Sequence, residues 1–250
     1  MFSMNRSNAF LIVAVPIFLL CSCSLNAAPD YSDYARLLKT YVAGDGVRYA
    51  EWAQQPGDVA RLKTFVTQLG EVEIDALSKE GQKALYINLY NAAMLQAVLD
   101  HYPIQSVKEI GLLPFSIFKK KFIPLGDERV SLDGVEKGIL LKTYFDPRIH
   151  FAVNCASGSC PPLRADPYCG DRLEVQLDEQ TRLFAQSDRA ARVHAAKRSV
   201  AYSELFKWYA DDFFVENPAQ FLNRYRESAL PIEYSVGWID YDWSLNAASN

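Results

Sequence analysis

The stretch SKEGQKALYINLYNAAMLQAVLD, residues 78–100, decides the fold that the sequence predicts. Ser78 is a residue type that caps helix N-termini, and Glu80 and Gln82 follow in what would be the first turns. Apolar residues then recur at helical spacing through Leu85, Leu89, Ala92, Leu95, Ala97 and Leu99. We therefore predict one long helix here, and its apolar content places it in the centre of the molecule.

Shorter elements are predicted on both sides of this helix. Helical periodicity marks residues 33–42, 58–70, 173–184, 202–209 and 218–226. β-favouring runs predict strands at residues 47–49, within 115–123, at 148–153 and at 232–241, and a strand end leading into a short helix at 131–141. Together these elements predict an α+β single domain with a central buried helix packed on an antiparallel sheet and surrounded by helices.

The N-terminus has the features of an export signal. Arg6 precedes a continuous apolar run at residues 9–20, which is shorter than the roughly 20 residues that a membrane-spanning helix needs. The following Leu-Cys-Ser-Cys resembles a lipobox, in which Cys23 would become the acylated first residue; ordinary cleavage near residues 25–27 is the alternative. We expect a signal at 1–28, one domain at 29–250, and a location in the periplasm or as a membrane-anchored lipoprotein of the bacterial envelope.

Composition limits the partners of the chain. The net charge of −4 over 250 residues gives no surplus of cations for phosphates, so we expect no nucleic acid. The sequence has no calcium loop and no glycine motif for phosphate, and its three histidines leave few options for zinc, so we expect no cofactor and no metal. The expected partner is a small-molecule or peptide-like substrate, with membrane contact only through a lipid anchor; the oligomeric state stays open.

The loop NCASGSCPP, residues 154–162, is the strongest candidate for chemistry. It follows His150, and a cysteine beside a histidine is the minimum set for a thiolate nucleophile with its base. On a strand at 148–153, side chains alternate, so Cys155 would point away from the face of His150 and lie about 17 Å from it. This geometry favours Cys160 over Cys155 as the nucleophile, with Glu136 or Asp146 orienting the imidazole.

The same residues allow a structural interpretation. Cys155 and Cys160 could close a short disulfide loop while His150 is satisfied in the core, and Cys169 would remain as a third thiol. A redox role for this pair is a further alternative, although CxxxxC is not the CxxC spacing of thioredoxin-like sites. Asn88 and Asn91 on the central helix must also find partners; they would satisfy loop backbone, bind substrate or hold the His150 loop.

Five blocks resemble a known family, the domain of unknown function 547. They are YINLYNAAMLQAVLDHYPIQSVKEIG (86–111), SLDGVEKGIL (131–140), RIHFAVNCASGSCPPL (148–163), LFKWYADDF (205–213) and YDWSLN (241–246). The resemblance runs from about residue 34 to residue 246, and such proteins often look like secreted or lipoprotein single domains. It also implies an architecture similar to papain-like and transglutaminase-like cysteine hydrolases, with 78–100 as the central helix and His150 as the strand histidine.

Two departures accompany the resemblance. Those hydrolases carry their cysteine at the start of the central helix, where this chain has none. Lys137 also stands where the resemblance leads us to expect a histidine after Glu136, which puts catalysis by that pair in doubt. Either the thiol has moved to the loop at 154–162, or the scaffold has become a binding module.

Two functional hypotheses follow from these residues. The first is a thiol-dependent hydrolase or acyl transferase that cleaves amide or peptide-like bonds in the cell envelope: Cys160 or Cys155 attacks, His150 moves the proton, Glu136 orients it, and backbone amides at 156–159 stabilise the oxyanion. The second is a non-catalytic envelope binding module with a disulfide between the cysteines. Its groove, or the substrate site of the enzyme, would be formed by Asn88, Asn91, Asn154 and Arg164.

Overall fold

The computed structural model describes residues 29–44 and 46–248. The predicted signal and Cys23 lie outside these residues. Among the described residues, no helix combines the length and the apolar character needed to cross a bilayer.

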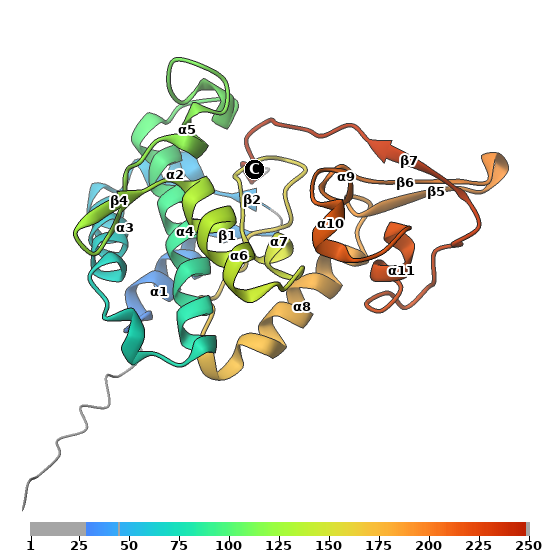
Figure 1. Cartoon of the computed structure of the whole chain (residues 1–250). Coiled ribbons are helices and arrows are strands. Elements are labelled where there is room, and N and C mark those ends of the chain that lie inside the picture. The colour runs from blue at the N-terminus through green and yellow to red at the C-terminus, as the bar shows by residue number, and fades with distance from the viewer. Residues whose placement is uncertain (1–28, 45, 249–250) are drawn as a thin grey trace, which may run out of the picture.

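Helices dominate the first two thirds of the described chain, and the three longest strands come late (Figure 1). The longer helices are α1 (Ser32–Tyr41), α3 (Pro56–Gly70), α4 (Lys79–His101) and α8 (Leu173–Ala185). The short helices are α2 (Tyr49–Ala53), α5 (Ser116–Lys119), a π-helix (Gly134–Leu140), α6 (Leu141–Tyr144), α7 (Ile149–Ala152), α9 (Leu205–Trp208), α10 (Ala210–Phe213) and α11 (Pro218–Leu222). The strands are β1 (Val42–Ala43), β2 (Gly46–Val47), β3 (Ile123–Leu125), β4 (Glu128–Val130), β5 (Ala191–His194), β6 (Ser199–Ser203) and β7 (Ser235–Ile239).

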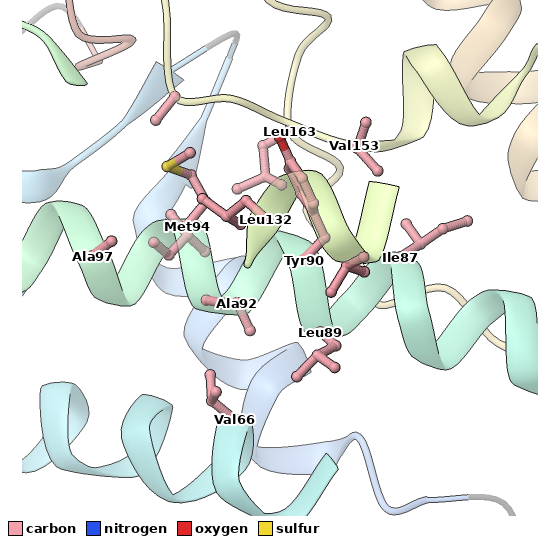
Figure 2. Packing of buried hydrophobic residues seen from close by; sticks show 14 of the residues in the cluster. Val66, Ile87, Leu89, Tyr90, Ala92, Met94, Ala97, Leu132, Val153 and Leu163 are labelled. Carbon is pink, nitrogen blue, oxygen red and sulfur yellow. The ribbon is translucent and has the colours of Figure 1, made fainter. Parts of the chain in front are cut away.

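The central helix predicted from the sequence is α4. Ser78 caps it by accepting a hydrogen bond from the backbone N–H of Gly81 at 3.0 Å. The helix is buried on all its faces between Lys83 and Leu99 apart from Gln96, which is half-buried. Figure 2 shows Val66 of α3 on one side of the helix and Leu132 and Leu163 on the other. Because it is enclosed on all sides, α4 organises the larger of two hydrophobic clusters.

The α+β class is confirmed, but the packing around α4 differs from the expected helix on a sheet. The main neighbours of α4 are helices: α3, the π-helix and α8, with a 3₁₀ turn at Gly170–Arg172. The strands form small sheets, the antiparallel pairs β1–β2 and β3–β4 and a three-stranded sheet in the order β5–β6–β7. In that last sheet β5 runs antiparallel and β7 parallel to β6.

The smaller hydrophobic cluster is formed by side chains of β5, β6 and helices α9 to α11, together with Phe151 of α7 and with Phe184 and Ala185 of α8. α7 joins it to the larger cluster, because Ile149 and Ala152 pack into the larger cluster while Phe151 packs into the smaller one. Residues 154–162, which follow α7, carry Cys155 and Cys160 and are called the cysteine loop below. This loop therefore begins where the two clusters meet.

Three predicted elements are wrong. Within residues 115–123, where strands are predicted, Ser116–Lys119 form helix α5 and only Ile123 lies in a strand, because the N–H of Lys120 donates to the carbonyl of Ser116 at 3.0 Å and closes a helical turn. Residues 148–153, predicted as a buried strand, form α7 instead, because the turn at Asp146 starts a helix: the Asp146 side chain accepts the N–H of Arg148 at 3.0 Å, and its carbonyl accepts the N–H of Ile149 at 3.1 Å. Residues 202–209, predicted as a helix, begin as the end of β6 and become helical only at Leu205. The pairing of β6 with two other strands overrides the local helical periodicity.

The C-terminal segment after β7 returns to the first half of the chain (Figure 1). Isolated bridges join Ser244 to Ser106, Leu245 to Ser157, and Ala247 to Val47 of β2. The segment therefore crosses the cysteine loop and carries the aromatic side chains of Tyr241 and Trp243 to it.

Candidate functional site

A cavity of about 630 Å³ opens beside the cysteine loop. Its lining brings together five segments that are far apart in the sequence: α4, α5, the π-helix, the region 150–161 and the chain from α9 to the C-terminal segment. Aromatic side chains form much of its wall, namely Tyr90, Phe115, Phe118, Trp208, Tyr209, Tyr241 and Trp243. Its polar groups include Glu136, His150, Cys155 and two lysines. Four predicted catalytic residues, Cys155, Cys160, His150 and Glu136, thus share one cavity.

Cys155 presents its thiol to this cavity, and several donors surround the sulfur. Cys155 Sγ lies 2.9 Å from Ser157 Oγ, 2.9 Å from Cys160 Sγ and 3.4 Å from the Tyr241 hydroxyl, and the Ser157 backbone N–H also hydrogen-bonds it. Burial by itself raises the pKa of this thiol, but the donors stabilise the thiolate more strongly, so the pKa of Cys155 is lowered to about 7. A large fraction of Cys155 is therefore thiolate at neutral pH.

Cys160 has the opposite character. It is 4% exposed, and burial together with the neighbouring Cys155 raises its pKa well above the ordinary value. The expectation that Cys160 attacks depended on a strand at 148–153, and that segment is helical. Geometry and charge therefore favour Cys155 as the nucleophile.

Side-chain amides fix the cysteine loop at its first residues. Asn91 of α4 donates to the carbonyl of Ala152 at 2.9 Å and accepts the N–H of Asn154 at 2.8 Å. Asn154 in turn donates to the carbonyl of Pro161 at 2.8 Å and accepts the N–H of Ala156 at 3.0 Å. Two of the residues predicted to bind substrate, Asn91 and Asn154, are thus buried supports of the loop.

Ala156, the residue after Cys155, has a left-handed backbone with φ of +59°. For a non-glycine residue this conformation costs roughly 1–2 kcal/mol, and tertiary contacts must hold it. Asn246 of the C-terminal segment supplies them: its N–H donates to the Ala156 carbonyl at 3.1 Å, and its side chain donates to Asn154 Oδ1 at 3.2 Å. The hydroxyl of Tyr49 then fixes Asn246 at 2.9 Å.

The expectation of an oxyanion hole from the amides at 156–159 is not supported. The N–H of Ala156 donates to Asn154 Oδ1, and the N–H of Ser157 donates to Cys155 Sγ. The N–H groups of Gly158 and Ser159 donate to the carbonyls of Ser244 at 2.8 Å and Asp242 at 3.1 Å. Because all four amides already have acceptors, they hold the loop against the C-terminal segment.

His150 is 2% exposed, and its ring lies 4.1 Å from the ring of Tyr209. Its Nε2 lies 2.9 Å from Asp212 Oδ2, so Asp212 takes the orienting role that was predicted for Glu136 or Asp146. A carboxylate can only accept, which places the imidazole proton on Nε2 and leaves Nδ1 as the basic nitrogen. Burial lowers the pKa of His150, although Asp212 opposes this effect, so His150 is neutral at pH 7.

Glu136 is a second buried group of the cavity. It projects from the π-helix Gly134–Leu140, and its Oε1 accepts a hydrogen bond from the Tyr209 hydroxyl at 3.1 Å. Burial raises the pKa of Glu136 above its ordinary value, partly offset by Lys137 and by Tyr209. Tyr209 therefore links Glu136, through its hydroxyl, to His150, through its ring.

Other predicted residues lie elsewhere or serve the structure. Asp146 accepts from Lys83 at 3.0 Å and from Arg148, so it holds α7 against α4 and α8. Asn88 bonds both backbone groups of Tyr168 at 2.7 and 2.9 Å, away from the cavity lining. Arg164 pairs with Glu179 at 2.7 Å and is also absent from the lining.

Lys137, the residue that departs from the expected histidine, lines the cavity and forms an ion pair with Asp133 at 2.9 Å. Its side chain is half-exposed, and an ammonium group offers only donors where an imidazole also offers an acceptor nitrogen. It does add positive charge beside Glu136 at the cavity.

Sequence reasoning missed Asp212, Tyr209, Tyr241 and Ser157. Three of them lie in the blocks LFKWYADDF and YDWSLN, which carried the family resemblance without a role for any single residue. Ser157 lies inside the cysteine loop itself, two residues after Cys155, where it could reach the sulfur only if the loop turns.

The described cysteines, Cys155, Cys160 and Cys169, are free thiols, so the predicted structural disulfide is not found. Among residues 29–44 and 46–248, no group of three or more histidine, cysteine, aspartate or glutamate side chains is arranged to hold a metal ion.

Comparison with known proteins supports the resemblance seen in the sequence. No curated protein and no solved structure is significantly similar to the chain, so the papain-like architecture remains a prediction. The matched family model spans α4, the π-helix, the cysteine loop and α8, and thus includes Glu136, His150 and Cys155 but not Asp212 or Tyr241. The family model described as protein of unknown function, DUF547, matches residues 74–185 of the chain.

Proposed function

We propose that this protein is a thiol-dependent hydrolase or acyl transferase acting on amide or peptide-like bonds in the cell envelope. The observation that carries the proposal is Cys155: a thiol with a pKa lowered to about 7, on the wall of a cavity of about 630 Å³ that also contains His150 and Glu136. Strongly shifted titratable groups that share one cavity are typical of catalytic sites.

The first step assigned to this site is attack of the Cys155 thiolate on the carbonyl carbon. The leaving nitrogen departs as the C–N bond breaks, and it takes a proton from the carboxyl of Glu136, whose pKa burial raises. A thioester on Cys155 results. Neutral His150, with Nε2 held by Asp212, then removes a proton through Nδ1 from water or from an acceptor amine that attacks the thioester. The C–S bond breaks, the acyl group leaves on the attacking oxygen or nitrogen, and Cys155 is released as the thiolate. His150 gives its proton to solvent, and Glu136 takes one back from solvent, which restores the starting state.

The aromatic wall suits a substrate with flat or apolar groups next to the cleaved bond. Trp208, Tyr241 and Trp243 lie within 6 Å of one another by ring centroids, at 4.8, 5.9 and 4.6 Å. Peptide planes and aromatic side chains of a peptide-like substrate would pack against this cluster. Lys119 and Lys137 on the same lining would attract a carboxylate of such a substrate.

The second candidate is a binding module that uses the same cavity without chemistry. It is favoured by one observation: the amides at 156–159 already have acceptors, so the loop offers no ready oxyanion hole. In that case the aromatic wall binds a peptide or glycan, and the donors around Cys155 serve to stabilise the loop.

The deciding experiment uses the reduced mature chain with p-nitrophenyl acetate and with a set of N-acylated dipeptides. If the protein is a hydrolase or acyl transferase, peptide mass spectrometry should find an acetyl group on Cys155, and at least one dipeptide should be turned over. Cys155→Ala should abolish both, whereas Cys169→Ala is the matched control and should leave both intact. Ligand-dependent quenching of Trp208 and Trp243 fluorescence with no acylation would refute catalysis and support the binding module.

The envelope location is part of this proposal and rests on the sequence of residues 1–28. Labelled palmitate fed to a bacterial host that expresses the full chain should appear on the protein if Cys23 is acylated. Cys23→Ala should lose the label. Label that persists in this variant would refute lipidation at Cys23, and release of unlabelled chain into the periplasm would indicate ordinary cleavage near residues 25–27.

A further inference from the structure

The two cysteines of the loop are close enough to react with each other. Their sulfurs lie 2.9 Å apart, and both are free thiols. A disulfide bond is about 2.05 Å long, so a movement of about 1 Å would bring the sulfurs to bonding distance. A turn already brings the two residues together, because the N–H of Cys160 donates to the carbonyl of Ser157 at 3.1 Å and its Sγ lies 2.9 Å from the N–H of Cys155.

We propose that Cys155 and Cys160 form a thiol pair that responds to hydroperoxides, in which Cys155 is oxidised first and Cys160 resolves it into a reversible disulfide. The thiol chemistry does not depend on the proposed hydrolase. Only its consequence, a reversible block of the nucleophile, rests on that function.

Exposure assigns the two roles. Cys155 is partly exposed on the cavity wall, where a small oxidant can reach it, whereas Cys160 is buried at 4% exposure. Hydroperoxides react with thiolates, and the donors around Cys155 make it the more acidic thiol of the pair. Cys155 is therefore the attacking sulfur and Cys160 the resolving one.

The reaction balances in two steps. The Cys155 thiolate attacks one oxygen of the hydroperoxide, the O–O bond breaks, and Cys155 becomes a sulfenic acid while the leaving alkoxide or hydroxide takes a proton from water. The Cys160 sulfur then attacks the sulfenic sulfur; the S–S bond forms and the S–O bond breaks. The departing oxygen leaves as water with the thiol proton. Both cysteines are oxidised by one electron each, and the hydroperoxide is reduced by two.

The first step prepares the second. The pKa of Cys160 is raised by burial and, in addition, by the neighbouring Cys155 sulfur. A protonated sulfenic acid carries no charge where the thiolate was negative, so this step lowers the contribution of Cys155 to the raised pKa of Cys160, while the larger contribution of burial remains. Cys160 thus becomes easier to ionise only after its partner has been oxidised.

The experiment uses the mature chain, reduced with dithiothreitol and then freed of it, with hydrogen peroxide as the oxidant and dimedone as a trap for sulfenic acid. Mapping by mass spectrometry should find a peptide linked through Cys155 and Cys160, with the loss of two hydrogen atoms and with reversal by dithiothreitol. The Cys169→Ser chain should behave like the wild type.

In Cys160→Ser the resolving thiol is missing, so dimedone should accumulate on Cys155, whereas the wild type should carry little of it. Equal dimedone labelling of Cys155 in both chains would overturn the proposal, as would a bridge to Cys169 or no oxidation of Cys155. If circular dichroism shows that Cys160→Ser does not fold, the test rests on the wild type alone: the Cys155–Cys160 disulfide must form with peroxide and be reversed by dithiothreitol. This experiment measures peptide masses after oxidation, so its result does not depend on the hydrolase assay. Acetylation of Cys155 by p-nitrophenyl acetate, with no Cys155–Cys160 disulfide after peroxide, would support the enzyme and refute the thiol pair.

Discussion

Removal of the Ser157 hydroxyl should make Cys155 a weaker acid. Ser157 Oγ lies 2.9 Å from the sulfur, and a hydrogen bond to a charged group contributes roughly 1.5–3 kcal/mol. Since a shift of one pKa unit corresponds to about 1.36 kcal/mol, Ser157→Ala should raise the pKa of Cys155 by about one to two units. From a starting pKa of about 7, the thiolate fraction at pH 7 would fall by about fivefold at the lower limit.

The assay is alkylation by iodoacetamide between pH 5 and pH 10, with the rate at each cysteine read from peptide masses. A thiol pKa lowered in the folded chain means that reactivity is present above about pH 7 and lost below it. Cys169 serves as the internal control: burial raises its pKa, and it has no contact with Ser157 that the substitution would remove. If the pH dependence of Cys155 alkylation does not change in Ser157→Ala, or if it shifts together with that of Cys169, then Ser157 is not a donor to the Cys155 sulfur.

Three further predictions concern the groups that hold the site. Asp212→Asn should lower the pKa of His150 further, because burial already lowers it and the Asp212 carboxylate opposes that effect; an NMR titration of the imidazole would check this, and an unchanged pKa would contradict the pairing. Since His150 stays neutral in the folded chain at pH values where it is protonated when unfolded, urea stability should fall as the pH drops below about 6.5, and more steeply in Asp212→Asn. Asn91→Ala should lose roughly 2–4 kcal/mol in urea unfolding and slow alkylation of Cys155, because two backbone groups of the loop lose their partner. Asn88→Ala is the matched control, since it loses similar bonds to a different loop; equal slowing of Cys155 in both variants would contradict a local role for Asn91.

Local signals predicted several elements of this fold. The helical period and the Ser78 cap defined α4, and the period at 173–184 defined α8, because helix caps and apolar stripes are contained within a few turns of chain. Of the five blocks that carry the family resemblance, those at 86–111, 131–140 and 148–163 lie within the segment that the family model matches, and those at 205–213 and 241–246 lie outside it. The same local reasoning failed at 148–153, because β-favouring side chains do not reveal a helix that Asp146 starts.

By itself, the sequence determined the α+β class, the buried central helix, the resemblance that the family model matches over residues 74–185, and four residues that share the cavity: Cys155, Cys160, His150 and Glu136. Only the tertiary structure decided what each of them can do. Tyr241 lies 86 residues from Cys155 and Asp212 lies 62 residues from His150, yet Tyr241 is one of the groups that lower the pKa of the thiol, and Asp212 holds the imidazole ring. Such pairs form because the C-terminal segment folds back over the cysteine loop, and no local pattern in the chain records a contact that packing between two hydrophobic clusters creates.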